Sequence, residues 1–171
     1  TIMKNFKHIL IAVFVSLAFV ACKSDDDAGE DGDAGAGTVA AKVSGSNFTS
    51  NSDFTVATQT QGGGSTTVRV QGSDNSGKGI VLMIGGFEGT GTYEIGGGAN
   101  IFVNASYVEA NASNPQDSQA WQAPYDDTVA GEINVTEINE TRVKGTFFFD
   151  AKNSNDDSVK MITEGSFDVE F

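Results

Sequence analysis

Hydrophobic and polar residues alternate along most of the chain from Thr38 onward. The alternation has a period of two, which is the spacing of side chains on one face of a β-strand. It is seen at Val39, Ala41 and Val43, at Phe54 and Val56, and at Val68 and Val70. Clusters of Gly, Asn, Asp and Ser separate these runs, and no long segment repeats apolar residues at helical spacing. The pattern predicts an all-β domain.

The middle of the domain predicts two longer strands. Residues 80–84 are apolar on both faces, which favours a central strand that is covered on each side. Ile101, Val103, Ala105 and Tyr107 recur at every second position and are therefore expected on one face of a strand. Together the runs favour an antiparallel β-sandwich of about eight strands, with a lipocalin-like closed barrel as the alternative.

The C-terminal strands show the alternation most clearly. With Ile162 as the exception, the apolar face of the last strand is predicted to hold Val159, Met161, Thr163, Gly165, Phe167, Val169 and Phe171. Residues directly opposite each other in a hairpin point to the same side, so a two-residue turn before this strand would set Val143 against Thr136. A three-residue loop at 139–141 instead sets Ile133 against Phe147, and we therefore predict the odd-length loop.

Residues 1–21 have the pattern of an export signal. Two lysines precede an apolar run at residues 9–20, which suits a signal peptide and falls short of the about 20 residues that a membrane-spanning helix needs. The run ends in Phe-Val-Ala before Cys22, which resembles a bacterial lipobox. Since Cys22 is the only cysteine, we predict that it carries the lipid that holds the chain to a membrane. An ordinary secretory peptide cut at an alanine is the alternative.

Residues 22–37 are predicted to be a lipidated, acidic tether, and residues 38–171 one all-β domain. The run of Asp and Glu after Cys22 resembles the signal that sends lipoproteins of the Bacteroidota to the outer face of the outer membrane, although a solvated linker has the same composition. The predicted location is the outer membrane, lipid-anchored at the cell surface. With 10 basic and 23 acidic residues the formal net charge is −13, so we expect no nucleic-acid partner.

Short segments of the chain resemble a family of small β-sheet surface lipoproteins of the Bacteroidota that is classed as a domain of unknown function. The segments with the clearest resemblance begin at Gly131 (GEINVT), Gly145 (GTFFF) and Ile162 (ITEGSF), and weaker ones begin at Gly72 (GSD) and Gly91 (GTY). The resemblance implies a fold and a location, and no activity.

Composition argues against most catalytic chemistry. The only histidine lies in the predicted signal peptide and the only cysteine is the lipid attachment site, so Ser-His-Asp and Cys-His catalysis and the usual zinc sites are excluded from the mature chain. A carboxylate pair drawn from Glu88, Glu94 and Glu109 is the remaining route to a hydrolase. We expect no enzyme, no cofactor and no metal.

Three acidic turns and one glycine-rich stretch have alternative interpretations. Residues 72–79 come within one residue of a P-loop, but Gly79 lacks the hydroxyl that holds Mg²⁺ and a strand follows, so we predict a hairpin loop. Calcium would suit Asp74 with Asn75, Asp126 with Asp127, or Asp156 with Asp157. Because none of these pairs has the spacing of a known calcium loop, we prefer solvated turn residues.

The loop-like region 111–127 is the best candidate for binding. It holds Trp121 and Tyr125, whose rings could stack on a sugar or anchor a protein, and Tyr107 is a further candidate ligand-binding residue. The alternative is that Trp121 and Tyr125 close one end of the core. Thr128 and Ser158 lie between Asp and Val, which resembles the short O-glycosylation motif of this phylum.

These features favour a surface-displayed outer-membrane lipoprotein whose non-catalytic β domain binds a glycan or a neighbouring envelope protein. One alternative is a structural envelope lipoprotein without a ligand. The other, less favoured, is a carboxylate-dependent hydrolase.

Overall fold

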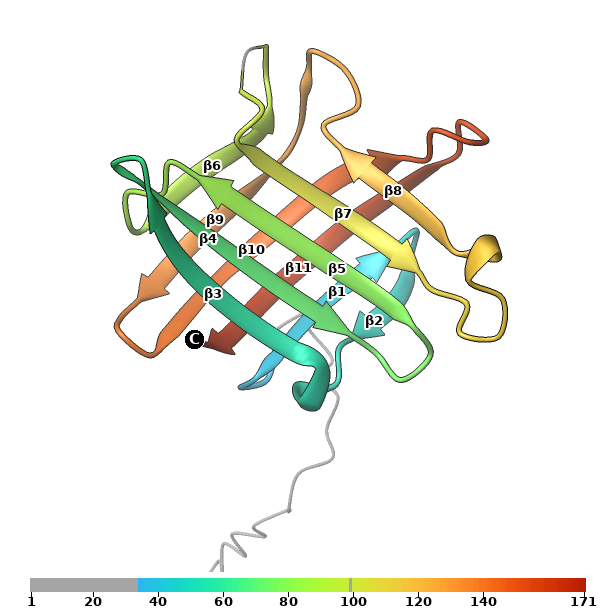
Figure 1. The fold of residues 1–171 in the computed structure, drawn as a ribbon, viewed down its shortest axis with the longest axis horizontal. Helices are drawn as coiled ribbons and strands as arrows, with labels where there is room; N and C mark the ends of the chain where they lie inside the picture. The colour runs from blue at the N-terminus through green and yellow to red at the C-terminus, as the bar shows by residue number, and fades with distance from the viewer. Residues whose placement is uncertain (1–33, 99) are drawn as a thin grey trace, which may run out of the picture.

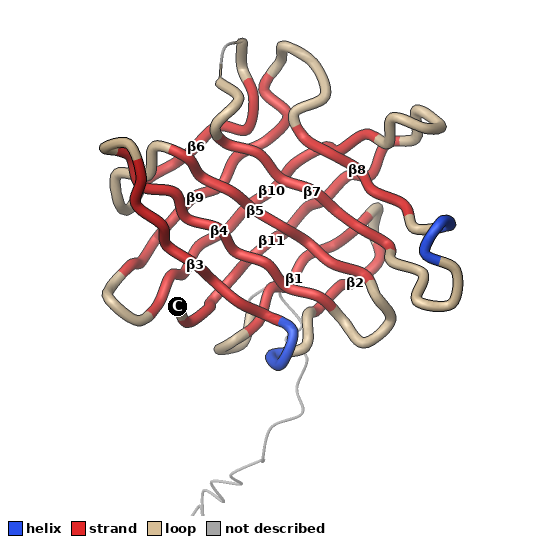
Figure 2. The backbone as a smooth tube through the Cα atoms, viewed as in Figure 1, coloured by secondary structure: helices blue, strands red, loops and turns tan. Residues whose placement is uncertain are grey.

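The computed structural model describes residues 34–98 and 100–171, so Cys22 and most of the predicted tether lie outside the described residues. The described part contains eleven strands and two single-turn 3-10 helices (Figures 1 and 2). The strands are β1 (Thr38–Val43), β2 (Ser46–Thr49), β3 (Thr55–Gly62), β4 (Ser65–Ser73), β5 (Lys78–Gly85), β6 (Gly91–Gly96), β7 (Val103–Glu109), β8 (Gln119–Ala123), β9 (Val129–Ile138), β10 (Arg142–Lys152) and β11 (Val159–Glu170). The helices are η1 (Ser52–Phe54) and η2 (Pro115–Asp117). The all-β prediction is confirmed, with eleven described strands in place of about eight.

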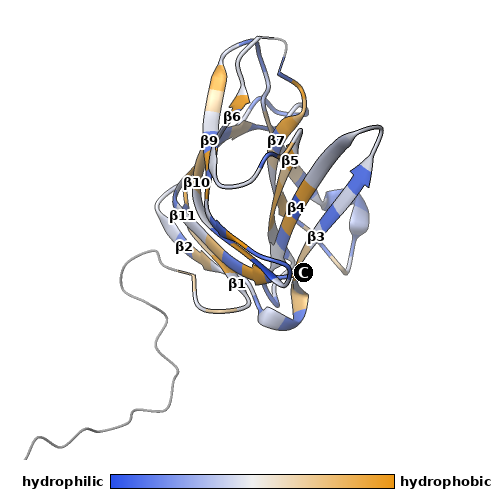
Figure 3. Ribbon diagram, turned by 90° about the vertical axis from the view of Figure 1, so that its left-hand side faces the viewer, coloured by the Kyte–Doolittle hydropathy of each residue, from blue (hydrophilic) through white to orange (hydrophobic). Residues whose placement is uncertain are grey.

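All strand pairs are antiparallel, and the sheet curls so that its two halves face each other. One half has the order β3-β4-β5-β7-β8, and the other contains β6-β9-β10-β11-β1-β2. The halves join where Lys152 of β10 pairs with Gln122 of β8. Figure 3 shows the two layers with hydrophobic residues along the strands of both, and in Figure 1 their strands cross steeply. The fold therefore combines the two layers of a sandwich with the continuous sheet of a barrel.

The core fills the space between the layers with residues from nearly every strand. Its largest fully buried side chains include Tyr107, Phe149, Phe167, Ile80, Leu82, Ile95, Ile133 and Ile162. Burying one such side chain contributes about 1.5–3 kcal/mol, so a core of this breadth can offset the chain entropy that is lost on folding.

A β-bulge in β11 changes which of its residues face the core. Phe147 pairs with Gly165 and Phe149 with Ile162, so two residues of β11 oppose the single residue Phe148. Glu164, at φ 51°, lies inside this bulge. Side chains before the bulge are therefore shifted to the opposite face. The predicted core face is correct for Gly165, Phe167 and Val169, and wrong for Val159, Met161 and Thr163, which are exposed, while the exception Ile162 is buried. Phe171, also predicted for the core face, follows the end of β11 and is exposed.

The β9–β10 hairpin confirms the predicted pairing of Ile133 with Phe147. Three residues, 139–141, separate the two strands, but the predicted alignment does not come from this loop. Next to the turn Val143 pairs with Ile138 and Asn139 N donates to Arg142 O at 3.0 Å, and a bulge at Thr136 then brings Ile133 opposite Phe147.

Three other strand predictions need correction. Phe54 ends η1 and Val56 points outward from β3, so both are exposed and Ala57 is the buried residue there. Strand β5 is central in its half-sheet, but its second face, with Val81 and Met83, is only half-buried because no further layer covers it. Ile101 precedes β7 and is exposed, whereas Val103, Ala105 and Tyr107 share the buried face as predicted.

Candidate functional site

Two connections lie side by side at one end of the domain. Because β6 pairs with β9 and β7 pairs with β8, the β6–β7 and β8–β9 connections emerge together, at the top of Figure 1. Their backbones are also bonded: Gly97 N donates to Thr128 O at 3.1 Å, and Gly98 N donates to Asp127 O at 2.8 Å. We refer to residues 97, 98, 100–102 and 124–129 as the loop end.

The loop end exposes four large apolar or aromatic side chains. Ile101 is 70% exposed, Phe102 64%, Val129 50% and Tyr125 43%. The backbone beneath them is held in place, since Phe102 N donates to Asn100 Oδ1 and Phe102 O accepts from Gly85 N at 2.8 Å. Isolated exposed apolar residues are ordinary, but a group of them on adjacent loops is typical of an interaction surface.

Trp121 lies below the loop end as part of the core. The middle of the predicted loop 111–127 is strand β8, which leaves Trp121 only 5% exposed. Its ring centroid is 5.7 Å from that of Tyr107, and its Nε1 donates to Ser158 Oγ at 2.9 Å. The alternative interpretation, a ring that closes the core, therefore describes Trp121, whereas Tyr125 is exposed on the following loop.

Tyr107 is also a core residue, at 2% exposure, and its hydroxyl belongs to a small polar cluster. The hydroxyl donates to Glu109 Oε1 at 2.9 Å, and Lys160 Nζ lies 3.3 Å from the same oxygen. The ammonium group of Lys160 also lies 4.7 Å from the Trp121 ring centroid, a cation–π geometry. Burial raises the pKa of Tyr107 above its usual value, and the hydrogen bond to Glu109 raises it further. Glu109, one of the three candidate carboxylates, is thus held in an ion pair.

Two turns of identical pattern place Thr128 and Ser158 differently. Asp126 Oδ1 accepts from the backbone N and hydroxyl of Thr128, and Asp156 Oδ1 accepts in the same way from Ser158. These hydrogen bonds lower the pKa of each aspartate, and the bond from the hydroxyl of Thr128 or Ser158 has the largest effect. Thr128 is exposed, whereas Ser158 Oγ also accepts a hydrogen bond from Trp121 Nε1. Of the two candidate glycosylation residues, Thr128 is therefore the accessible one.

The remaining acidic turn is the β4–β5 hairpin predicted for residues 72–79. Asp74 Oδ1 accepts from the backbone N of Ser76 and of Lys78, so the carboxylate closes its own loop. Within residues 34–98 and 100–171, no group of three acidic, His or Cys side chains is arranged to hold a metal ion.

The Asp156 turn leads to a prediction for acid, because Trp121 is the only tryptophan and reports on Ser158. The lowered pKa of Asp156 means that its stabilising hydrogen bonds are complete above the ordinary aspartate pKa, about 3.9, and are lost as the pH falls through the lower folded value. We expect tryptophan emission to remain constant on acidification to about that pH and to change only below it.

Asp156→Asn removes the carboxyl that titrates and keeps the Ser158 hydroxyl to which Trp121 donates, so it should abolish this acid transition. Asp126→Asn is the matched control, since it alters the twin turn and leaves Asp156 unchanged. A transition that persists in Asp156→Asn, or that disappears in both variants, would contradict this assignment.

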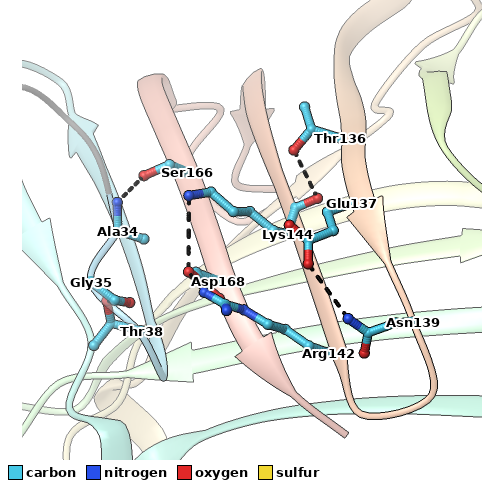
Figure 4. Close-up of polar contacts among 10 residues, drawn as sticks. All are labelled: Ala34, Gly35, Thr38, Thr136, Glu137, Asn139, Arg142, Lys144, Ser166 and Asp168. Atoms are coloured by element: carbon cyan, nitrogen blue, oxygen red, sulfur yellow. Dashed lines mark hydrogen bonds and ion pairs between the residues drawn. The ribbon is translucent and has the colours of Figure 1, made fainter.

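The described chain begins on the outer face of β11, at the opposite end of that strand from Ser158. Ala34 is buried and its backbone N donates to Ser166 Oγ (Figure 4). Gly37 N donates to Asp168 O at 2.7 Å. The buried Asp168 carboxylate accepts from Nε and Nη2 of Arg142 and lies 4.0 Å from Lys144 Nζ. The first described residues are thus fastened to the sheet by hydrogen bonds.

Comparison with known proteins gives one match. A family model described as a domain of unknown function (DUF6252) matches residues 37–169. The chain belongs to this family. The match confirms the expectation of a domain of unknown function over the part that carried the resemblance, while the phylum and the lipid anchor stay predictions. No curated protein and no solved structure matches the chain.

Sequence reasoning missed Ile101 and Phe102 at the loop end. Because Ile101 fits the period-two alternation of β7, the predicted strand begins at Ile101, two residues before the observed start at Val103. The available signal was the glycine run before it: Gly96, Gly97 and Gly98 all have φ between 73° and 84°, a backbone that favours glycine and ends a strand.

Among residues 34–98 and 100–171, the structure contains no helix with the length and apolar composition that a membrane span requires.

Proposed function

We propose that this chain is a lipid-anchored outer-membrane protein whose β domain binds a glycan or a neighbouring envelope protein through the loop end, without catalysis. The observation that carries the proposal is the presence of four exposed side chains at the loop end, those of Ile101, Phe102, Tyr125 and Val129. Aromatic side chains bury large areas at little cost in conformational entropy, which suits them to recognising a sugar face or a protein surface.

The position of the first described residues supports this proposal. Ala34 and Gly37 are bonded to Ser166 and Asp168. Ser158 lies about 30 Å from these residues along β11, at roughly 3.3 Å per residue. It accepts a hydrogen bond from Trp121 of β8, the strand that leads into the loop end at residue 124. A chain attached to a membrane through Cys22 would then present the loop end away from its point of attachment.

Crosslinking on intact cells tests the binding role. A photoreactive residue in place of Tyr125 should crosslink to a defined partner, identified by mass spectrometry as a protein or a glycan. Crosslinking should fall strongly in the double variant Ile101→Ser, Phe102→Ser, because it removes most of the exposed apolar surface. The control is Phe148→Ser, which alters a similarly exposed phenylalanine on the outer face of β10. Equal crosslinking in both variants would contradict the loop-end proposal. The absence of any crosslinked product, even without these substitutions, would favour a structural protein without a ligand.

Metabolic labelling tests the anchor separately. Cells fed a labelled fatty acid should label the wild-type chain and not Cys22→Ser. Label in the serine variant would show that Cys22 is not the lipidated residue.

A further inference from the structure

Three described strands, β2, β3 and β6, are hydrogen-bonded on one side only. The free side of such a strand presents unpaired N–H and C=O groups, which proteins usually protect with short length, charge, proline or a bulge. Strand β2 has four residues, and β6 carries Glu94 and a register shift between Ile95 and Gly96. These two edges have the usual protection.

Strand β3 has no such protection. It has eight residues, TVATQTQG, without a charge or a proline. Its pairing with β4 runs without a register shift from Thr55 opposite Gly72 to Gly62 opposite Ser65. The outer half of the strand, residues 58–62, is exposed. An uncharged edge without a bulge favours the addition of another strand.

The turn that ends β3 identifies its free backbone groups. Gly63 and Gly64, with φ of 61° and 81°, form a two-residue hairpin turn, so Gly62 and Ser65 form a hydrogen-bonded pair. Because hydrogen-bonded and non-bonded pairs alternate in an antiparallel ladder, Thr60 points its backbone groups toward β4, while Gln59 and Gln61 point theirs away. Thr55, which has the same parity as Gln59, donates its N–H to Ser52 O and not to β4, as this alternation requires.

We propose that β3 pairs antiparallel with β3 of a second copy of this chain, about a two-fold axis at Gln59. In this arrangement Thr58 lies opposite Thr60 of the second copy, and Gln59 lies opposite Gln59. The sheet then continues from one copy into the other. A two-fold contact of this kind is closed, so it gives a dimer and not a fibre.

Charge favours a second copy at this edge over other places on the surface. Two chains of net charge −13 repel wherever their carboxylates meet. No Asp or Glu occurs between Asp53 and Asp74, and Arg69 is the sole charged residue of the β3–β4 hairpin. The hairpin is therefore a surface on which two copies can approach without opposing carboxylates.

Sedimentation of the full chain in detergent tests the proposal with two variants at one position. Gln59→Pro removes a backbone donor that points away from β4, so the dimer should weaken by about tenfold or more while far-UV circular dichroism and thermal unfolding stay near wild type. Gln59→Ala keeps the donor and should dimerise like wild type. A monomeric wild type, or a Gln59→Pro variant that dimerises equally well, would overturn the proposal.

Gln59→Glu gives a second readout that does not depend on the proline. It sets like charges against each other at the two-fold axis, so its dimer should be weak at low salt and recover at high salt. A dimer that ignores salt in this variant would also contradict pairing through β3. The loop-end variant Phe102→Ser should dimerise normally, so this inference and the proposed binding role can fail independently.

Discussion

Replacing Trp121 with alanine should lower the free energy of unfolding by about 3–5 kcal/mol, the range for truncating a large aromatic residue in a core. The indole is 5% exposed, contacts the Tyr107 ring and donates to Ser158 Oγ, so its loss leaves a cavity and an unpaired hydroxyl acceptor. Tyr125→Ala should change the free energy of unfolding by less than about 0.5 kcal/mol, because its side chain lies on an exposed loop. Urea denaturation followed by far-UV circular dichroism measures both, since Trp121→Ala has no tryptophan to follow.

This pair of variants separates two roles that the sequence could not distinguish. A Trp121→Ala protein of wild-type stability would show that the indole does not close the core, and would return it to the candidate binding residues. A Tyr125→Ala protein that is strongly destabilised would show that the loop end is structural, and would weaken the proposed binding role.

Much of the fold was predictable because it rests on local patterns. The period-two alternation identifies strands such as β4 and β10, and the matching of apolar faces is enough to align Ile133 with Phe147. These inferences need only neighbouring residues and the geometry of a hairpin.

The errors occurred where tertiary structure overrides the local pattern. Nothing in the sequence of β11 requires Glu164 to adopt φ 51°, yet this single bulge transfers Val159 and Met161 to the solvent face. The bulge permits Ile162 and Phe149 to pair in the core. A residue that breaks the alternation, as Ile162 does, is thus the sequence signal of the bulge.

The candidate site was predictable only in part, because it is assembled from distant segments. Tyr125 was identified as an exposed aromatic candidate, but its neighbours Ile101 and Phe102 come from the β6–β7 connection. Which connections meet at one end depends on strand order, here β6 beside β9 and β7 beside β8. No local pattern encodes that order.

Gly131→Ala should lower the free energy of unfolding by about 3 kcal/mol, at the upper end for overpacking a core. A Cβ at Gly131 would lie 2.1 Å from Phe148 O and 2.5 Å from Phe149 Cα, which are backbone atoms of the paired strand and cannot rotate away. A Cβ at Gly145 would lie 2.6 Å from the ring of its cross-strand partner Phe167, and one at Gly165 would lie 2.5 Å from the ring of Phe147. These three glycines lie in the segments GEINVT, GTFFF and ITEGSF, and at each of them close packing leaves no room for a side chain.

Gly62→Ala is the matched control, since Gly62 also lies in a strand but has no atom within 4 Å of the added carbon. It should be neutral or stabilising by up to about 1 kcal/mol, because alanine restricts the unfolded chain. Urea midpoints at constant m-value compare the two variants. If Gly131→Ala unfolds at the same urea concentration as Gly62→Ala, then β9 and β10 do not approach so closely, and the glycine motifs need another explanation. If only Gly131→Ala is destabilised, Gly131 is a constraint of strand packing, and the exposed residues of the loop end remain the candidates for function.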